Sequence, residues 1–347
     1  MTDTTTDKKR VLVIGAGGFI GGFIAAEGLR RGLDVTAAIR KSTSRRYLTD
    51  PRLHFLTLDY DDPRTVAEAM QAALPEGERW DYVIHNLGAT KCNNPDDFDR
   101  INFGYVRTIV EALKAVGKIP EKFLLMSSLS AIGPGDEKNY TPLTIDTPAR
   151  PNTRYGVSKI RAEQYLINES GIPFVIFRAT GVYGPHEQDY LMMIKSIDSH
   201  LDVGMGYRKQ MLTFIYVDDL VNAMYDALPS DATTGRSYII SEPRAYTQRE
   251  FRTMVSKALG DRFVIPLKLP MWVVYIASVA AETVGRLRHK PSTLNRDKFK
   301  IMKQRNWACD VTPACRDFGF KVEYPLERGV EATVKAYLEE KRRSKHS

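Results

Sequence analysis

Two short stretches of the chain carry a serine, a tyrosine and a lysine that together could move a proton on and off an oxygen atom. Tyr155 and Lys159 lie four residues apart, so on a helix they would share one face. A lysine ammonium one turn away favours the phenolate of a tyrosine whose pKa is otherwise about 10. A serine of the pair Ser127-Ser128, on a neighbouring strand, would hold a substrate oxygen against that tyrosine. We therefore predict proton transfer at an alcohol or carbonyl oxygen.

A glycine-rich loop near the N-terminus predicts a dinucleotide as the second reactant. Its glycines follow an apolar run at 11–14 and open a helical pattern. Glycines at such positions allow a tight turn, a close approach of the backbone to a diphosphate, and close packing of helix on strand. The diphosphate would lie at the helix N-terminus, where unpaired N–H groups favour an anion. The residues expected around it are Gly15, Gly17, Gly18, Phe19, Ile20 and Gly21.

The end of the second expected strand indicates which dinucleotide binds. An acidic residue there would bind the ribose hydroxyls of NAD. This chain has Arg40, Lys41 and Ser42 instead, followed by Arg45. Arginine binds a 2′-phosphate through paired N–H donors. We predict NADP(H) rather than NAD(H), with Arg40 as the main contact and the other three residues as further candidates.

The alternation of strand and helix patterns predicts the fold that must bring these groups together. Strands joined by helices form βαβ units, and these build a parallel sheet covered on both faces. The fold class is therefore α/β, a Rossmann-type doubly wound parallel sheet with a smaller, interleaved C-terminal region. We expect strands at 11–14, 34–39, 53–58, 82–84, 123–126 and 174–177, with helices at 19–31, 65–73, 98–116 and 153–169.

Composition and turn signals set the wider organisation. We assign 1–178 to an NADP-binding domain, with its core from about residue 10, and 179–347 to a substrate-binding region that ends in a basic tail at 341–347. The net charge is +8, but the basic residues are spread out and no recognition motif for nucleic acid is present. The three cysteines lack metal-ligand spacing, so we expect no metal site, reduced thiols and a cytoplasmic protein.

The segment 271–290 has three interpretations. Residues 271–281 carry no charge, and a basic cluster follows them at 286–290. An apolar helix of this length is too short to span a bilayer. It could be a plain core helix, a lid over an apolar pocket, or a helix that contacts a membrane surface from the cytoplasmic side.

The glycine loop and the pair Tyr155 and Lys159 resemble the extended branch of the short-chain dehydrogenase/reductase superfamily, the epimerase/dehydratase-like enzymes. Further stretches, at 58–61, 83–89, 177–185 and 214–219, resemble that branch in order, so the likeness covers about residues 10 to 260. Asn102 matches a helix asparagine that supports the fourth and fifth strands. The resemblance implies cofactor contacts at Asp59, Tyr60, Asn86, Leu87, Gly88, Tyr155, Lys159, Arg178 and Val182.

Within that branch, 126–134 is most similar to the 3β-hydroxysteroid dehydrogenase and dihydroflavonol reductase groups. This resemblance implies Ser128 as the catalytic serine beside Tyr155 and Lys159, although Ser127 and Ser130 stay open. It implies an NADP(H)-dependent oxidoreductase that interconverts a ketone and a secondary alcohol on a bulky apolar substrate. A sterol or a long-chain 3-oxo lipid, such as a keto-sphingoid base, would fit.

Two other functions compete with this one. A nucleotide-sugar epimerase or dehydratase with tightly bound NAD(P) would use cations such as Arg208, Lys209 and Arg249 to hold a sugar diphosphate. A non-catalytic dinucleotide sensor or scaffold would keep the fold without the chemistry. The family resemblance further implies a homodimer through the helices expected at 98–116 and 153–169.

Overall fold

The computed structural model describes residues 8–288 and 292–346, and its centre is one parallel sheet of seven strands. The strand order is β10-β6-β5-β4-β1-β2-β3, and every neighbouring pair is parallel. The chain order reverses between β1 and β4, which is where α/β sheets of this kind bind ligands. The strands are β1 (Arg10–Ile14), β2 (Asp34–Ile39), β3 (His54–Thr57), β4 (Tyr82–His85), β5 (Lys122–Ser128), β6 (Phe174–Ala179) and β10 (Arg236–Ile240).

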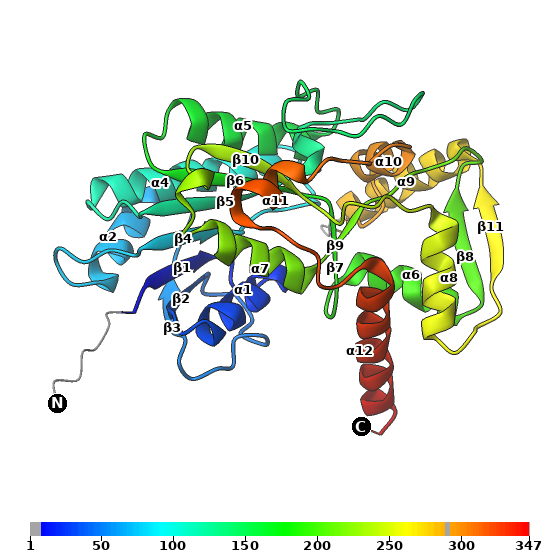
Figure 1. Ribbon diagram of the computed structural model, residues 1–347, viewed down its shortest axis with the longest axis horizontal. Coiled ribbons are helices and arrows are strands. Elements are labelled where there is room, and N and C mark those ends of the chain that lie inside the picture. Colours follow the sequence, from blue (N-terminus) through cyan, green and yellow to red (C-terminus); the bar gives the residue numbers. More distant parts are fainter. Residues whose placement is uncertain (1–7, 289–291, 347) are drawn as a thin grey trace.

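Helices cover both faces of this sheet, which confirms the predicted fold class (Figure 1). Alternate strand residues face two separate buried apolar clusters, one under each layer of helices. One layer contains α1 (Phe19–Arg30) and α7 (Val217–Ala227), and the other contains α2 (Pro63–Ala73), α4 (Tyr105–Ala115) and α5 (Arg154–Asn168).

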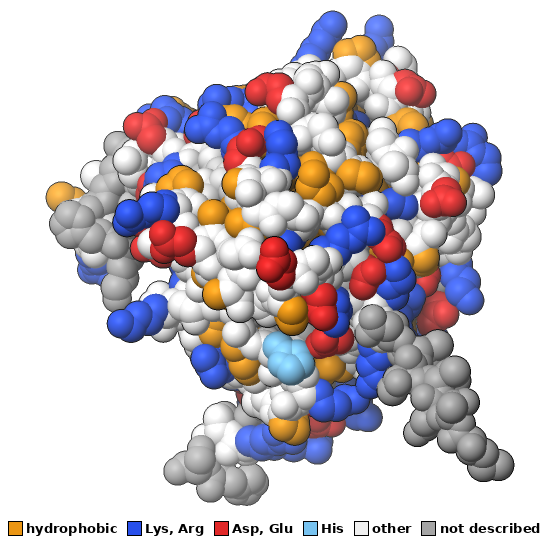
Figure 2. Space-filling model, turned by 90° about the vertical axis from the view of Figure 1, so that its left-hand side faces the viewer, with side chains coloured by type: hydrophobic (Ala, Val, Ile, Leu, Met, Phe, Trp, Pro, Cys, Tyr) orange, Lys and Arg blue, Asp and Glu red, His pale blue; other side chains and the backbone are white. Residues whose placement is uncertain are grey.

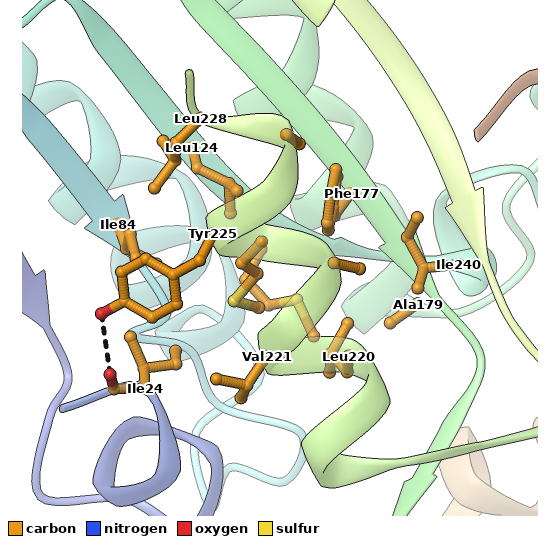
Figure 3. Close-up of a cluster of buried hydrophobic side chains, with 14 of the residues drawn as sticks. Ile24, Ile84, Leu124, Phe177, Ala179, Leu220, Val221, Tyr225, Leu228 and Ile240 are labelled. Atoms are coloured by element: carbon orange, nitrogen blue, oxygen red, sulfur yellow. Dashed lines mark hydrogen bonds between the residues drawn. The ribbon is translucent and has the colours of Figure 1, made fainter. Parts of the chain in front are cut away.

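Helix α7 shows how the later part of the chain enters this core (Figure 3). Its apolar side chains, among them Leu220 and Val221, point at β6, β10 and the centre of the sheet. The Tyr225 hydroxyl donates a hydrogen bond of 2.7 Å to the Ile24 carbonyl of α1. The seventh strand, β10, is absent from the sequence prediction. Its five residues are a short apolar run, and its place beside β6 is set by pairing with a distant segment.

The long helix expected at 98–116 is divided in the structure. It consists of α3 (Asp97–Asp99), a π-helical turn at Arg100–Gly104, and α4. A π-turn inserts an extra residue into a helix and often marks a functional position. Here the turn contains the buried Asn102, so the irregularity places that side chain.

A smaller lobe lies beyond the carboxyl ends of the strands, at the right of Figure 1. It has its own apolar cluster, formed mainly by α6, α8, α12 and the β7–β9 pair. The elements of this part of the chain are β7 (Gly181–Tyr183), α6 (Gln188–Asp198), β8 (Leu201–Met205), β9 (Phe214–Tyr216), α8 (Gln248–Ala258), β11 (Ile265–Leu269), α9 (Met271–Leu287), α10 (Arg296–Lys303), α11 (Thr312–Phe318) and α12 (Leu326–His346).

Two predictions about the C-terminal half have clear outcomes. The apolar segment is a single helix, α9, which continues past the expected end at residue 281 to Leu287. Among the described helices, none is long and apolar enough to cross a bilayer. The predicted basic tail belongs largely to α12, where Lys341 forms an ion pair with Asp198.

The surface at the seven-stranded-sheet end of the molecule, at the left of Figure 1, carries both positive and negative side chains. On the face shown in Figure 2, lysine and arginine side chains are scattered, with acidic side chains among them. Lys9, for example, pairs with both Asp81 and Glu121 at this end of the sheet. Such mixing weakens the long-range field that a basic surface would otherwise produce.

Candidate active site

The serine at the end of β5 and the tyrosine at the start of α5 meet at the carboxyl edge of the sheet. The Ser128 hydroxyl lies close enough to that of Tyr155 to act on its pKa. The Ser128 hydroxyl also accepts the backbone N–H of Ser130 at 3.2 Å. Ser127 precedes Ser128 on the strand, so its side chain leaves on the opposite side, where its hydroxyl donates to Glu163. Of the three candidate serines, the structure brings Ser128 to the tyrosine.

Backbone contacts hold the first turn of α5 against this serine. Thr153 caps the helix, and its hydroxyl accepts the N–H of Gly156 at 2.9 Å. A Cβ atom added to Gly156 would lie 2.3 Å from the Ser130 carbonyl oxygen, so only glycine permits this approach. The Asp297 carboxylate of α10 accepts the N–H of Arg154 at 2.8 Å and that of Tyr155 at 3.3 Å. A residue from the C-terminal third therefore helps to position the tyrosine. No sequence motif predicted this role for Asp297.

Lys159 lies one turn further along α5, as its spacing predicts. It is buried, its Nζ donates to the Met126 carbonyl at 2.8 Å, and it lies 5.9 Å from the centre of the Tyr155 ring. Burial lowers the pKa of Lys159 to about 8, and the nearby Glu163 carboxylate opposes that fall. Burial also raises the pKa of Tyr155, against the opposing effect of the nearby Ser128 hydroxyl. The pKa of Tyr155 therefore lies above its ordinary value and not below it as predicted, because desolvation of the hydroxyl outweighs the effects that favour the phenolate.

A buried ion pair supports the lysine from the next turn of the same helix. Glu163 is fully buried and accepts bonds from the Arg178 guanidinium, with 2.7 Å to Nη2 and 3.1 Å to Nε. Arg178 also donates to the Ile145 carbonyl at 3.4 Å. Its guanidinium is therefore bonded to Glu163 in the interior. It is not free to make the cofactor contact that the sequence predicts for Arg178. Sequence reasoning missed Glu163, although its spacing of four from Lys159 was visible.

The loop after β4 joins the lysine to the π-turn. Asn102 accepts the N–H of Ala89 at 2.8 Å, and it donates to the Ala89 carbonyl and the Ser158 hydroxyl, each at 3.0 Å. A Cβ on Gly88 would lie 3.0 Å from Lys159 Nζ, so the glycine leaves the ammonium accessible from this side. His85 lies beside these groups. Burial, together with the Lys159 charge, lowers the pKa of His85 to about 3, so the ring is neutral.

The glycine loop lies next to this β4 loop, at the point where the strand order reverses. Gly15 has φ +82°, and a Cβ there would lie 2.8 Å from the Leu87 backbone. A Cβ on Gly21 would lie 2.2 Å from the Gly15 carbonyl oxygen. Gly18 is exposed at the N-cap of α1, and the first turn has neither a side-chain cap nor an acidic residue. The N-terminus of this helix fits a dinucleotide diphosphate, because no side chain caps it and no carboxylate in its first turn would repel an anion.

The turn after β2 lies over the same loop. A Cβ on Gly17 would lie 2.1 Å from the Thr43 methyl carbon, and Thr43 is bonded to Arg40 by two hydrogen bonds, of 3.0 Å and 2.9 Å. Arg40, Lys41 and Ser42 are exposed there. Arg45, in contrast, lies over the Phe55 ring at 4.2 Å. The first three predicted residues are therefore placed where a ribose phosphate could be held.

The remaining residues predicted to contact the cofactor differ in how far their side chains are exposed. Asp59 is exposed after β3, and its carboxylate accepts the N–H of Asp61 at 3.2 Å. The Tyr60 side chain is buried against Tyr105, with ring centres 5.3 Å apart, so it faces the core instead of a ligand. Asn86 donates its backbone N–H to the Ile14 carbonyl at 3.0 Å, and Val182 is half-buried in β7.

The chain is similar in sequence to several known proteins. The model of the NAD dependent epimerase/dehydratase family matches residues 11–241. A UDP-glucose 4-epimerase of Corynebacterium glutamicum is 25% identical over 330 residues, which cover 87% of this chain and 92% of the relative. The sterol-4-alpha-carboxylate 3-dehydrogenase, decarboxylating, of Mus musculus is 22% identical over 357 residues, which cover 97% of this chain and 93% of the relative.

A solved structure gives the same fold. The UDP-glucose 4-epimerase of Thermotoga maritima with UDP-glucose superposes with a TM-score of 0.75 at 19% identity, covering 95% of this chain and 99% of that one. At this identity the likeness concerns the fold. The sequence relatives, by their names, act on both sugar nucleotides and sterols.

Proposed function

The chain belongs to the NAD-dependent epimerase/dehydratase family, and within it we propose an NADP(H)-dependent oxidoreductase that interconverts a ketone and a secondary alcohol on a bulky apolar substrate. One observation carries this proposal. The Tyr155 hydroxyl lies near that of Ser128, one helical turn from the buried Lys159, beside a glycine loop that fits a dinucleotide. A proton donor and a hydride site therefore share one edge of the sheet.

The protonation states favour reduction of the ketone. A bound nicotinamide supplies the hydride. Because burial raises the pKa of Tyr155, its hydroxyl holds its proton at neutral pH and can give it to a developing alkoxide. The Ser128 hydroxyl would donate to the same oxygen, and Lys159, with a pKa of about 8, remains charged at neutral pH and would stabilise the phenolate that results.

The preference for NADP(H) is supported by the charge around the turn after β2. Residues 35–49 contain no Asp or Glu, and Arg40 and Lys41 are exposed beside the glycine loop. A carboxylate in this turn would repel a 2′-phosphate, whereas a guanidinium binds it with two parallel hydrogen bonds.

An apolar substrate is supported by the sterol-acting relative, which matches the chain over 97% of its length. We propose a sterol-like compound or a long-chain 3-oxo lipid such as a keto-sphingoid base. A sugar-nucleotide epimerase is the second candidate, because the bacterial relative of that name matches over 92% of its own length. Arg208, Lys209 and Arg249 are exposed and could hold its diphosphate.

The test measures net oxidation of NADPH and NADH by the purified protein against sterol ketones, 3-oxo lipids, flavonoid ketones and sugar nucleotides. We expect NADPH oxidation with an apolar ketone. Tyr155→Phe should lower kcat by about 10²- to 10⁴-fold while NADPH still binds. Interconversion of UDP-sugars without net NADPH oxidation would favour the epimerase instead.

A pair of arginine variants tests the cofactor. Arg40→Asp should raise the KM for NADPH about 10- to 100-fold, which is the loss expected for hydrogen bonds to a charged group. Arg46→Asp is the matched control, because the Arg46 guanidinium lies 3.4 Å from Glu340 and over the Tyr47 ring. An unchanged KM in Arg40→Asp would contradict the assignment of NADP(H).

A further inference from the structure

Helix α9 presents an apolar face to solvent. Its exposed positions follow helical spacing, and Trp272, Ile276 and Leu287 are 67%, 57% and 77% exposed. Val274 and Ser278 are buried on the opposite side. Large apolar side chains that are exposed together on one helix face mark a contact surface.

The two-stranded ribbon of β8 and β11 adds a second apolar surface directly before α9. Leu201 pairs with Ile265, and Val203 pairs with Leu267, so the four side chains share one face of the ribbon. All four are exposed. Leu269 and Pro270 connect this ribbon to α9, so we refer to the exposed apolar residues of the ribbon and the helix together as the apolar end.

The exposed charges where the ribbon meets the start of α9 are basic. Residues 203–210 and 263–281 contain no Asp or Glu, whereas Arg208, Lys209 and Lys268 are present and exposed. The loop at 207–209 follows Gly206, whose N–H donates to the Leu269 carbonyl at 2.8 Å, so it lies at the start of α9. Arg288 is exposed at the other end of the helix.

We propose that the apolar end docks on the surface of an anionic lipid bilayer, with α9 lying in the plane of the interface. Helices of this kind bury an apolar face at the boundary of headgroup and acyl chain, with aromatic side chains at that depth and cations on the lipid phosphates. Trp272 and the exposed Tyr207 supply the aromatic side chains. With 17 residues, α9 extends about 26 Å, and it lies on the bilayer instead of crossing it.

A second copy of the chain fits the same surface less well. A symmetric dimer places the same patch on both partners, so Arg208 and Lys209 of each copy would lie near like charges of the other. Anionic headgroups provide the charge that the patch lacks.

The docking helix is one element away from the active site. Tyr275 of α9 packs edge-on against Phe299 of α10 at 5.3 Å, and Glu282 pairs with Arg296 at 3.1 Å. Helix α10 in turn holds Asp297 on the first turn of α5. An apolar substrate dissolved in the bilayer would therefore start close to Tyr155, a consequence that rests on the proposed function, whereas the docking itself does not.

Vesicle binding tests the docking without any substrate. The full-length protein is mixed with vesicles of phosphatidylcholine alone, or with phosphatidylglycerol added, and binding is followed by flotation and by tryptophan emission. Trp80 is fully buried and Trp307 is partly buried, so a blue shift reports mainly on Trp272. We expect a blue shift with the anionic vesicles and at least about tenfold weaker binding to the neutral ones.

Two variants decide the outcome. Trp272→Ser/Ile276→Ser should weaken binding by about tenfold or more, measured by flotation. Ile167→Ser is the matched control, because Ile167 is 51% exposed on α5, away from the apolar end, and it should bind as the wild type does. Equal binding by the double variant, or none by the wild type, would overturn the proposal. So would a wild-type dimer that does not bind vesicles and that the double variant converts to monomers in sedimentation.

The outcomes separate this proposal from the proposed reaction. Vesicle binding without turnover of any ketone would leave the docking standing and reject the reaction. Turnover of an apolar ketone by a protein that does not bind vesicles would support the reaction and reject the docking.

Discussion

Replacing Lys159 by methionine should stabilise the folded protein while it abolishes catalysis. Burial lowers the pKa of Lys159 from 10.5 to about 8, and a shift of that size corresponds to about 3 kcal/mol of destabilisation at neutral pH. Methionine has a similar length and adapts to the site. The variant loses the 2.8 Å hydrogen bond to the Met126 carbonyl, which costs about 1 kcal/mol. We therefore expect a net gain of about 2 kcal/mol at pH 7.

The gain should depend on pH in a defined direction. The unfolded lysine keeps its proton up to about pH 10.5, whereas the folded one releases it near pH 8, so the unfolded state binds more protons between these values. Wild-type stability therefore rises with pH across this window relative to the variant, and the advantage of the variant shrinks. Urea unfolding, followed by circular dichroism at several pH values from about 7 to about 10.5, measures this difference.

Lys118→Met is the matched control. Lys118 is also buried, but its Nζ donates to three carbonyls, those of Leu74, Pro75 and Glu78, at 3.3, 3.1 and 2.9 Å. Its removal leaves all three without this donor, so Lys118→Met should destabilise the protein. A Lys159→Met variant that is less stable than the wild type at neutral pH, or a difference that does not change with pH, would refute the reasoning.

Two further predictions concern groups around the site. Glu163→Gln leaves the buried Arg178 without a counter-charge and should cost about 3–5 kcal/mol in urea unfolding. Glu327→Gln, at an exposed ion pair, should cost far less, and similar losses in the two variants would contradict this account. Gly156→Ala should lower kcat more than about tenfold, because its Cβ would lie 2.3 Å from the Ser130 carbonyl and push Tyr155 away from Ser128. Gly104→Ala, whose Cβ would have its nearest neighbour at 3.8 Å, should leave kcat unchanged, and equal activity of the two alanine variants would reject the steric argument.

Most strands of the parallel sheet could be predicted because they are buried on both faces, the exception being the edge strand β3, in which only Leu56 is buried. Such strands are continuous apolar runs between turn residues, and the six expected ones agree with the structure within a few residues. Strand β10 was not predicted, because its five residues carry a weak local signal. Its pairing with β6 joins segments some sixty positions apart, since Arg236 pairs with Val175. The π-turn around Asn102 was not predicted either, since the periodicity of apolar residues in a helix does not reveal one inserted residue.

Some residues of the candidate site could likewise be predicted from sequence, whereas others needed the structure. Tyr155 and Lys159, and the glycines of the cofactor loop, depend on spacing along one helix or one turn, so the sequence alone could determine them. Ser128 needed the structure, because the choice among neighbouring serines depends on which strand face meets α5. Arg178 could not be assigned from sequence either, since nothing local indicates that its partner is Glu163.

By itself, then, the sequence determined the fold class, the cofactor loop and the spacing of the proton-transfer groups, because these follow from short-range geometry. Tertiary structure alone decided the protonation states, since the pKa of a tyrosine or a lysine depends on how much water the rest of the chain removes. It also decided that Asp297 reaches the first turn of α5 and that one face of α9 is exposed to solvent, because a helical pattern does not specify which side another segment will cover.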